Sequence, residues 1–185
     1  MNELTEILAA VEKGDATAAD QLLPLVYTEL RRLAAARMAN EKPGQTLNPT
    51  ALVHEAYVRL VDGEAPQHWD GRRHFFAAAA ESMRRVLIER ARSKRSEKHG
   101  GAMRRVDLDT LRIADETRAE ELIMLDEALG ELEKHDPQIA ALVKLRFFAG
   151  LTHQESAAAL GITRRAADGL WTLARAWLYQ RLTRE

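Results

Sequence analysis

The chain has 185 residues, of which 46% are hydrophobic and 30% charged, and its net charge is −1. These proportions are typical of a folded, soluble protein and exclude a disordered or membrane-embedded chain. The absence of cysteine excludes disulfide bonds and thiolate metal sites. Acidic residues stand where a signal peptide needs basic ones, and no apolar run reaches the length of a membrane span. We therefore expect a cytoplasmic protein.

Apolar residues spaced three and four apart, without runs of β-branched residues, predict an all-α fold. In chain order, the sequence predicts helices over about residues 2–13, 17–39, 49–61, 74–95, 118–135 and 137–148, followed by a terminal helical pair. Asn48 is expected to cap the third helix, with Pro49 at its first position. Residues 96–117 show little periodicity and contain Gly100-Gly101, which favours a linker between two domains.

Charge is segregated along the chain. From Arg72 to Arg105 there are eleven lysines and arginines against three glutamates, whereas Glu120 to Asp136 holds seven acids against one lysine. A polyanion would be attracted to the first stretch and repelled by the second.

The long helix expected over residues 74–95 has an apolar side and an arginine side. Phe75 and Phe76 fall within the apolar arc, which favours a place in the core over stacking on bases. An aromatic ring at Trp69 followed by a row of arginines suits single-stranded or melting DNA, although a solvated arginine face is the alternative. The candidate DNA contacts in this segment are Trp69, Arg72, Arg73, His74, Arg84, Arg85, Arg92 and Arg95.

Residues 152–171 have the pattern of a helix-turn-helix. Gly161 fits the turn, Ala158 fits the small residue where the two helices touch, and Thr152 and Thr163 fit the two N-caps. The apolar residues expected to lock the second helix onto the first are Leu160, Ile162, Ala167 and Leu170. An ordinary helical hairpin in an alanine-rich protein is the alternative interpretation.

The outward arc of the second helix is unusual for a helix that reads DNA. It holds Arg165, Asp168, Gly169, Thr172, Arg175 and Ala176. An aspartate that faces phosphates is unfavourable, and a glycine within a helix costs about 1 kcal/mol. The candidate DNA contacts in the helix-turn-helix are His153, Gln154, Arg164, Arg165, Thr172 and Arg175.

No catalytic or metal site is predicted. His54-Glu55 begins like a zinc-protease motif, but the position four residues after the histidine is Val58. The other histidines lack ligand spacing, and no glycine-rich loop matches a phosphate cradle. We expect a protein that is not an enzyme and needs no cofactor.

Taken in order, these segments resemble the extracytoplasmic-function (ECF) sigma factors of the sigma-70 family over nearly the whole chain. Residues 52–60 are similar to the polymerase-binding helix of region 2, and residues 69–95 to its −10 segment. Residues 145–152 and 174–178 are similar to the segments that flank the helix-turn-helix of region 4. The resemblance implies a region 2 domain over residues 1–95 and a region 4 domain over residues 118–185, joined by a flexible linker over residues 96–117.

The resemblance also implies the partners. The first domain would bind RNA polymerase core at the largest-subunit clamp and open the −10 element, while the second would read the −35 element near the polymerase flap. The candidate core-polymerase contacts are Asn48, Thr50, Leu52, Val53, Glu55 and Arg59.

One departure from the family concerns regulation. Family members usually carry an acidic cluster before the polymerase-binding helix, whereas residues 48–51 contain no carboxylate. Resemblance to a subgroup without this cluster implies activation by a Ser/Thr kinase, and control by an anti-sigma factor stays open. Thr50, the second residue of the expected helix, is the first candidate for phosphorylation because a helix N-terminus favours an anion, and Thr46 is the second.

Two other functions stay open on the sequence. One is a free-standing helix-turn-helix regulator that binds duplex DNA as a dimer. The other is a helical interaction module, such as an antagonist of transcription factors, whose basic face binds an acidic partner. Tight binding to polymerase core together with promoter-specific initiation distinguishes a sigma factor from both.

Overall fold

The structure, a computed structural model, describes residues 2–38, 48–61, 71–97 and 119–183. Within these ranges the regular elements are helical and no strand occurs, which confirms the all-α prediction. In chain order they are α1 (Asn2–Glu12), α2 (Ala16–Met38), α3 (Pro49–Val61), α4 (Gly71–Glu97), α5 (Ala119–His135), α6 (Pro137–Val143), the π-helical turn η2 (Lys144–Phe148), α7 (His153–Leu160) and α8 (Arg164–Leu182).

The helix starts follow local capping chemistry. Asn48 Oδ1 accepts a hydrogen bond from the Thr50 backbone N–H at 2.9 Å, and Pro49 is the first helical residue, both as predicted. Asp136 caps α6 in the same way by accepting from the backbone N–H of Ile139 at 3.0 Å. α4 ends at Glu97, two residues into the predicted linker, and linker residues from 98 onward lie outside the described residues.

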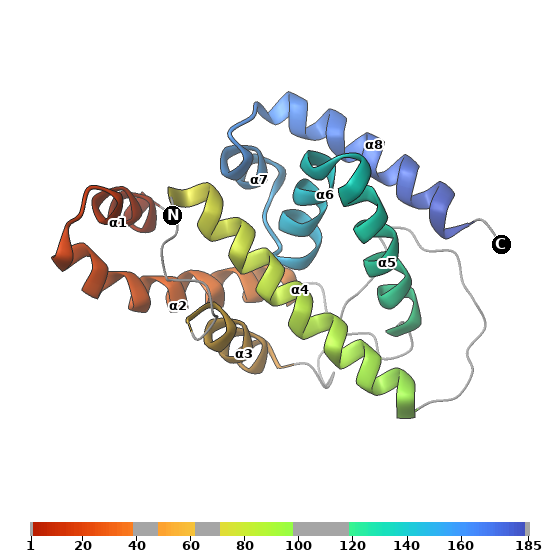
Figure 1. Cartoon of the computed structure of the whole chain (residues 1–185), viewed down its shortest axis with the longest axis horizontal. Helices are drawn as coiled ribbons and strands as arrows, with labels where there is room; N and C mark the ends of the chain where they lie inside the picture. Colours follow the sequence, from red (N-terminus) through yellow and green to blue (C-terminus); the bar gives the residue numbers. More distant parts are fainter. Residues whose placement is uncertain (1, 39–47, 62–70, 98–118, 184–185) are drawn as a thin grey trace.

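Helix α4 lies at the centre of the described fold. Figure 1 shows it crossing diagonally between α1–α3 on one side and α5–α8 on the other. It packs against α1, α3, α5, α7 and η2. We refer to α1–α4 and α5–α8 as the two halves of the chain. Residues of both halves, from Leu4 to Leu178, form one continuous apolar core.

Burial along α4 covers more than the predicted apolar side. Phe75 and Phe76 are completely buried and meet edge to face, which confirms their place in the core. Ile88 and Ala91, which lie on the arginine side, are buried as well. At 3.6 residues per turn this arc is wider than a single packing face, so α4 is covered from two directions.

Among the described helices, none combines the length and apolar character that crossing a membrane requires.

Candidate nucleic-acid interface

The helix-turn-helix is built by two caps and one turn. Thr152 and Glu155 form a reciprocal capping box at the start of α7, and Thr163 Oγ1 accepts from the Ala166 backbone N–H at 3.2 Å at the start of α8. Gly161 ends α7 with φ of 67°, a left-handed conformation that favours glycine. These observations confirm the predicted caps and turn.

The predicted contact between the two helices is wrong in one position. Ala158 is exposed, whereas Ala157 and Ala159 are buried. Successive helix positions are 100° apart, and Ala158 falls on the side of α7 opposite the inward-facing Ser156 and Leu160. On α8, Ala167 is buried and Leu170 is half-buried against the core, as predicted.

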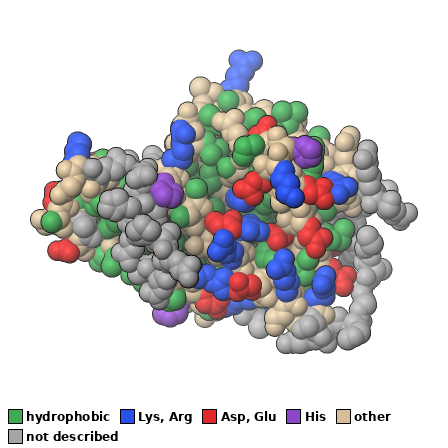
Figure 2. All heavy atoms as spheres, viewed as in Figure 1, with side chains coloured by type: hydrophobic (Ala, Val, Ile, Leu, Met, Phe, Trp, Pro, Cys, Tyr) green, Lys and Arg blue, Asp and Glu red, His purple; other side chains and the backbone are tan. Residues whose placement is uncertain are grey.

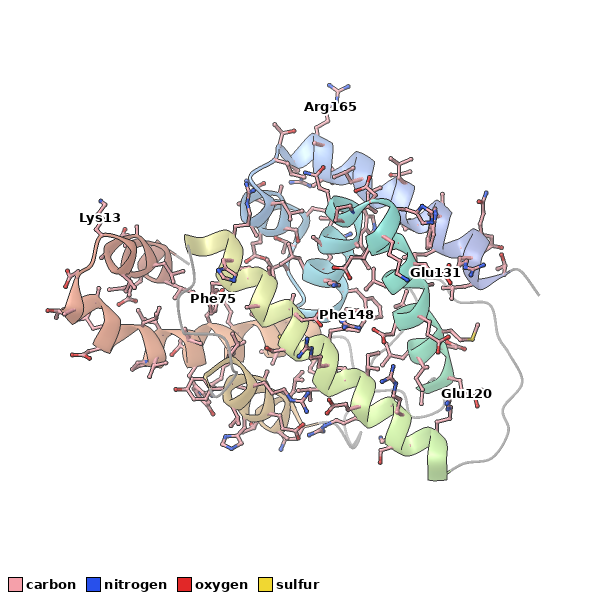
Figure 3. The ribbon with its side chains drawn as sticks, in the orientation of Figure 1. Lys13, Phe75, Glu120, Glu131, Phe148 and Arg165 are labelled. Atoms are coloured by element: carbon pink, nitrogen blue, oxygen red, sulfur yellow. The ribbon has the colours of Figure 1, made fainter. Side chains whose placement is uncertain are left out.

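The outward arc of α8 faces solvent, as predicted. Its exposed residues include Arg164, Arg165, Asp168, Gly169, Thr172 and Arg175. Figure 3 shows Arg165 pointing away from the body of the molecule at the first turn of the helix. Gln154, on α7, is also exposed. Except for His153, which is half-buried, the candidate contacts of the helix-turn-helix therefore lie on the surface.

Arg146 and His153 pack against Trp171 of α8. The Arg146 guanidinium lies 3.9 Å from the centroid of the Trp171 ring, and the His153 ring meets Trp171 edge to face. His153 Nδ1 lies 2.6 Å from Asp168 Oδ1. Burial, together with the positive charge of Arg146, lowers the pKa of His153 despite the nearby Asp168 carboxylate. This lowering favours the neutral form of His153 at pH 7.

Several arginines of α4 pair with acidic side chains. Arg84 donates to Glu81 on its own helix and forms an ion pair with Asp126 of α5. The side chains of Arg84 and Asp126 are only 21% and 9% exposed. Arg92 Nη2 lies 3.6 Å from the second oxygen of Asp126. Two candidate phosphate-binding arginines thus share one nearly buried carboxylate.

Glu81 is the second carboxylate of this network. Burial is the largest single influence and opposes ionisation. The hydrogen bonds and charge of Arg84, the charge of Lys144 and a hydrogen bond from Arg85 outweigh it and lower the pKa of Glu81 to about 2. Figure 2 shows the result on the surface: basic and acidic side chains alternate over α4 and α5. Arg85 and Arg95 remain exposed on this side.

Further contacts join the two halves of the chain at the helix-turn-helix. Arg32 of α2 forms an ion pair with Glu155 of α7 at 2.9 Å. The guanidinium of Arg73, at the start of α4, lies against Gly161, so a side chain at position 161 would collide with it. Arg73, another candidate DNA contact, therefore faces the turn of the helix-turn-helix.

Helix α3 is tied to α4 by two charged pairs. Arg59 donates to Glu89 at 2.8 Å, and Glu55 pairs with Arg90. Leu52 and Val53 are buried in the core, so they position α3 and do not offer their side chains to a partner. The start of the helix, with Asn48 and Thr50, is exposed.

The model of the ECF sigma factor family matches residues 1–184. The chain belongs to the ECF sigma factor family. No curated protein and no solved structure matches it. Membership confirms the resemblance seen in the sequence, gives the chain a role as a sigma factor in transcription initiation, and implies promoter DNA and RNA polymerase as its partners.

Some predicted contacts of this sigma factor belong to segments outside the described residues. Trp69 and Thr46 lie outside the described residues, as does the side chain of Arg72. His74 is exposed at the start of α4. Sequence reasoning missed Asp126 and Arg146, which contact the candidate residues from distant parts of the chain. A basic stretch followed along the chain by an acidic one was the sequence signal that could have indicated a charged partner such as Asp126.

Proposed function

We propose that this sigma factor binds RNA polymerase core and directs it to promoters through two separate domains. The part around α2–α4 would bind the clamp and open the −10 element, and the part around α5–α8 would read the −35 element. The observation that carries the proposal is the capped helix-turn-helix with an exposed basic recognition helix, in a chain that the family model matches nearly end to end. Phosphates favour such a row of arginines.

On α3, the polymerase contact would come from the exposed start of the helix. Asn48 and Thr50 are exposed there, while Glu55 and Arg59 are half-buried and already paired with α4. The buried Leu52 and Val53 support this surface from beneath. Core binding by this site therefore depends on a few polar groups near the helix N-terminus.

The arrangement seen in the free chain would not bind promoter DNA well. Arg84 and Arg92 are paired with Asp126, and Arg73 lies against Gly161. The Arg84 side chain is only 21% exposed, so we infer that phosphates reach it when the two halves separate as each half docks on its own polymerase surface. Binding both halves to one polymerase then supplies a high effective concentration at the two promoter elements.

The proposal is tested by titrating fluorescently labelled protein against polymerase core and, separately, against promoter duplex. We expect tight binding to core, and specific binding to the duplex only when core is present. Nanomolar, sequence-specific binding of duplex by the free protein would support the free-standing regulator instead. Binding to neither would leave the interaction module as the better interpretation.

We also propose that phosphorylation of Thr50 supplies the charge that the polymerase contact lacks. Thr50 is exposed in the first turn of α3, where the helix dipole favours an anion. A phosphate would add nearly two negative charges toward the basic clamp. Thr46, a second hydroxyl, lies outside the described residues.

Kinase-treated protein is expected to bind core about tenfold or more tightly than unmodified protein, and Thr50→Ala should abolish the gain. Thr17 provides a matched control. It is exposed at the second position of α2, and its backbone N–H donates to Asp15 Oδ1 at 2.9 Å, as that of Thr50 does to Asn48. Thr17→Ala should change nothing. Full activity of unmodified protein, unaffected by Thr50→Ala, would contradict the switch.

A further inference from the structure

We propose that Asp168 and Gly169 form a cytosine-reading site on α8. In it the Asp168 carboxylate accepts a hydrogen bond from the exocyclic amine of a cytosine in the major groove, and Gly169 leaves room for the base edge. This inference deepens the proposed function, on which it rests, by assigning a base to two residues that would otherwise weaken DNA binding.

Asp168 lies where a recognition helix contacts bases. α8 begins at Arg164, and residues in the first turns of a recognition helix reach the base edges. The Asp168 side chain is 50% exposed and shares the outward arc with Arg165 and Thr172. A negative charge at this position is repelled by phosphates, so a compensating contact is needed for it to favour DNA binding.

The carboxylate lies close to two neighbouring side chains. His153 Nδ1 lies 2.6 Å from Oδ1, and Arg164 Nε lies 3.9 Å from Oδ2. His153 is itself fixed against the Trp171 ring. Because the lowered pKa favours neutral His153, this contact leaves the negative charge of Asp168 available to a base. A half-exposed carboxylate confined by such neighbours loses less entropy on binding a base than a fully free one does.

Gly169 has no role in the fold that the structure shows. It lies in the middle of α8, its φ is not in the left-handed region, and a Cβ built on it would meet nothing within 4 Å. Glycine is about 1 kcal/mol less favourable than alanine there. Open space beside Asp168 on a DNA-facing surface is what close approach of a base pair requires.

The chemistry of the carboxylate selects the base. An ionised carboxylate only accepts hydrogen bonds. In the major groove cytosine presents a donor, the N4 amine, whereas guanine presents two acceptors. Adenine presents a donor beside the N7 acceptor, which repels a carboxylate but suits an asparagine side chain that carries both a donor and an acceptor. Asp168 is therefore matched to cytosine, and asparagine at the same position would be matched to adenine.

The test uses the reconstituted holoenzyme and a promoter library in which the upstream element is randomised, with the selected sequences read from the transcripts. We expect wild-type protein to favour cytosine at one base pair by roughly fivefold or more. Asp168→Asn should move the preference at that base pair from cytosine to adenine. Asp168→Ala should remove the preference there and leave the other positions unchanged.

Two glycine substitutions provide a matched comparison. Gly130 of α5 is exposed, and a Cβ on it would also meet nothing within 4 Å. Gly169→Ala and Gly130→Ala should both raise the melting temperature, because alanine is the better helix former. Only Gly169→Ala should weaken selection at the Asp168 position.

The alternative role for Asp168 is to tie α8 to α7 through His153. A structural role would lower the melting temperature and reduce transcription from all library members alike, without altering base preference. That result, or an unchanged base profile in Asp168→Asn, would overturn the inference while leaving the proposed function intact. If wild-type holoenzyme selected no sequence from the library, the proposed function would fail as well.

Discussion

Replacing Asp126 by asparagine is expected to raise the affinity of the free protein for single-stranded DNA about tenfold. Asp126 is nearly buried and pairs with both Arg84 and Arg92. Removing its charge leaves these arginines without their shared carboxylate and weakens the contact between α4 and α5. We call the arrangement in which α4 contacts α5 the closed arrangement. A tenfold gain corresponds to a loss of about 1.4 kcal/mol in the free energy that favours it. Binding can be measured by anisotropy with a labelled oligonucleotide of random sequence, since phosphate contacts carry little sequence information.

Glu131→Gln is the matched control for this change. Glu131 lies on the same helix but pairs with Arg181 of α8, away from α4. Glu131→Gln removes the same charge as Asp126→Asn. An equal gain in DNA affinity in both variants would therefore show an effect of net charge alone and contradict the closed arrangement.

Separation of the two halves can be followed directly in the same variants. The chain has no cysteine, so cysteines introduced at the exposed positions Lys13 and Gln180 can carry two spin labels without other changes. We expect one narrow distance distribution in the parent protein and a broader, longer one with Asp126→Asn.

Replacing Phe148 by alanine is expected to lower the free energy of unfolding by about 3–5 kcal/mol. Phe148 is completely buried in η2, meets Phe147 edge to face, and lies in the interior in Figure 3. η2 packs against both α4 and α6, so the cavity would loosen α5–α8 and their contact with α4.

Tyr179→Ala serves as the comparison in denaturant unfolding. Tyr179 is an exposed aromatic residue on α8, and its replacement should change the free energy of unfolding by about 0.5 kcal/mol or less. Similar losses for the two variants would mean that η2 does not belong to the core.

Features set by neighbouring residues could be predicted from the sequence. The capping box at Thr152, the left-handed turn at Gly161 and the cap at Asn48 each depend on chemistry within a few positions, and each is confirmed. The apolar arc of α4 likewise predicted the burial of Phe75 and Phe76. The error at Ala158 came from choosing one alanine among three without knowing how α7 is rotated against α8.

Contacts between distant segments could not be predicted in the same way. The pair between Arg84 and Asp126 joins residues 42 positions apart, and that between Arg32 and Glu155 spans an even longer separation. The opposite charges of the two stretches were visible in the sequence, but charge alone does not show that α5 packs against α4. The support of Trp171 by Arg146 was missed for the same reason.

The central claim, that this chain directs polymerase to promoters as a sigma factor, is tested most directly by mapping transcription starts in vitro. Purified core is combined with the protein on a library of genomic fragments, and the 5′ ends of the transcripts are sequenced. The account predicts starts that appear only when the protein is added and that share two short upstream elements at a constant spacing. Starts identical to those of core alone, or starts that share no pair of elements, would contradict it.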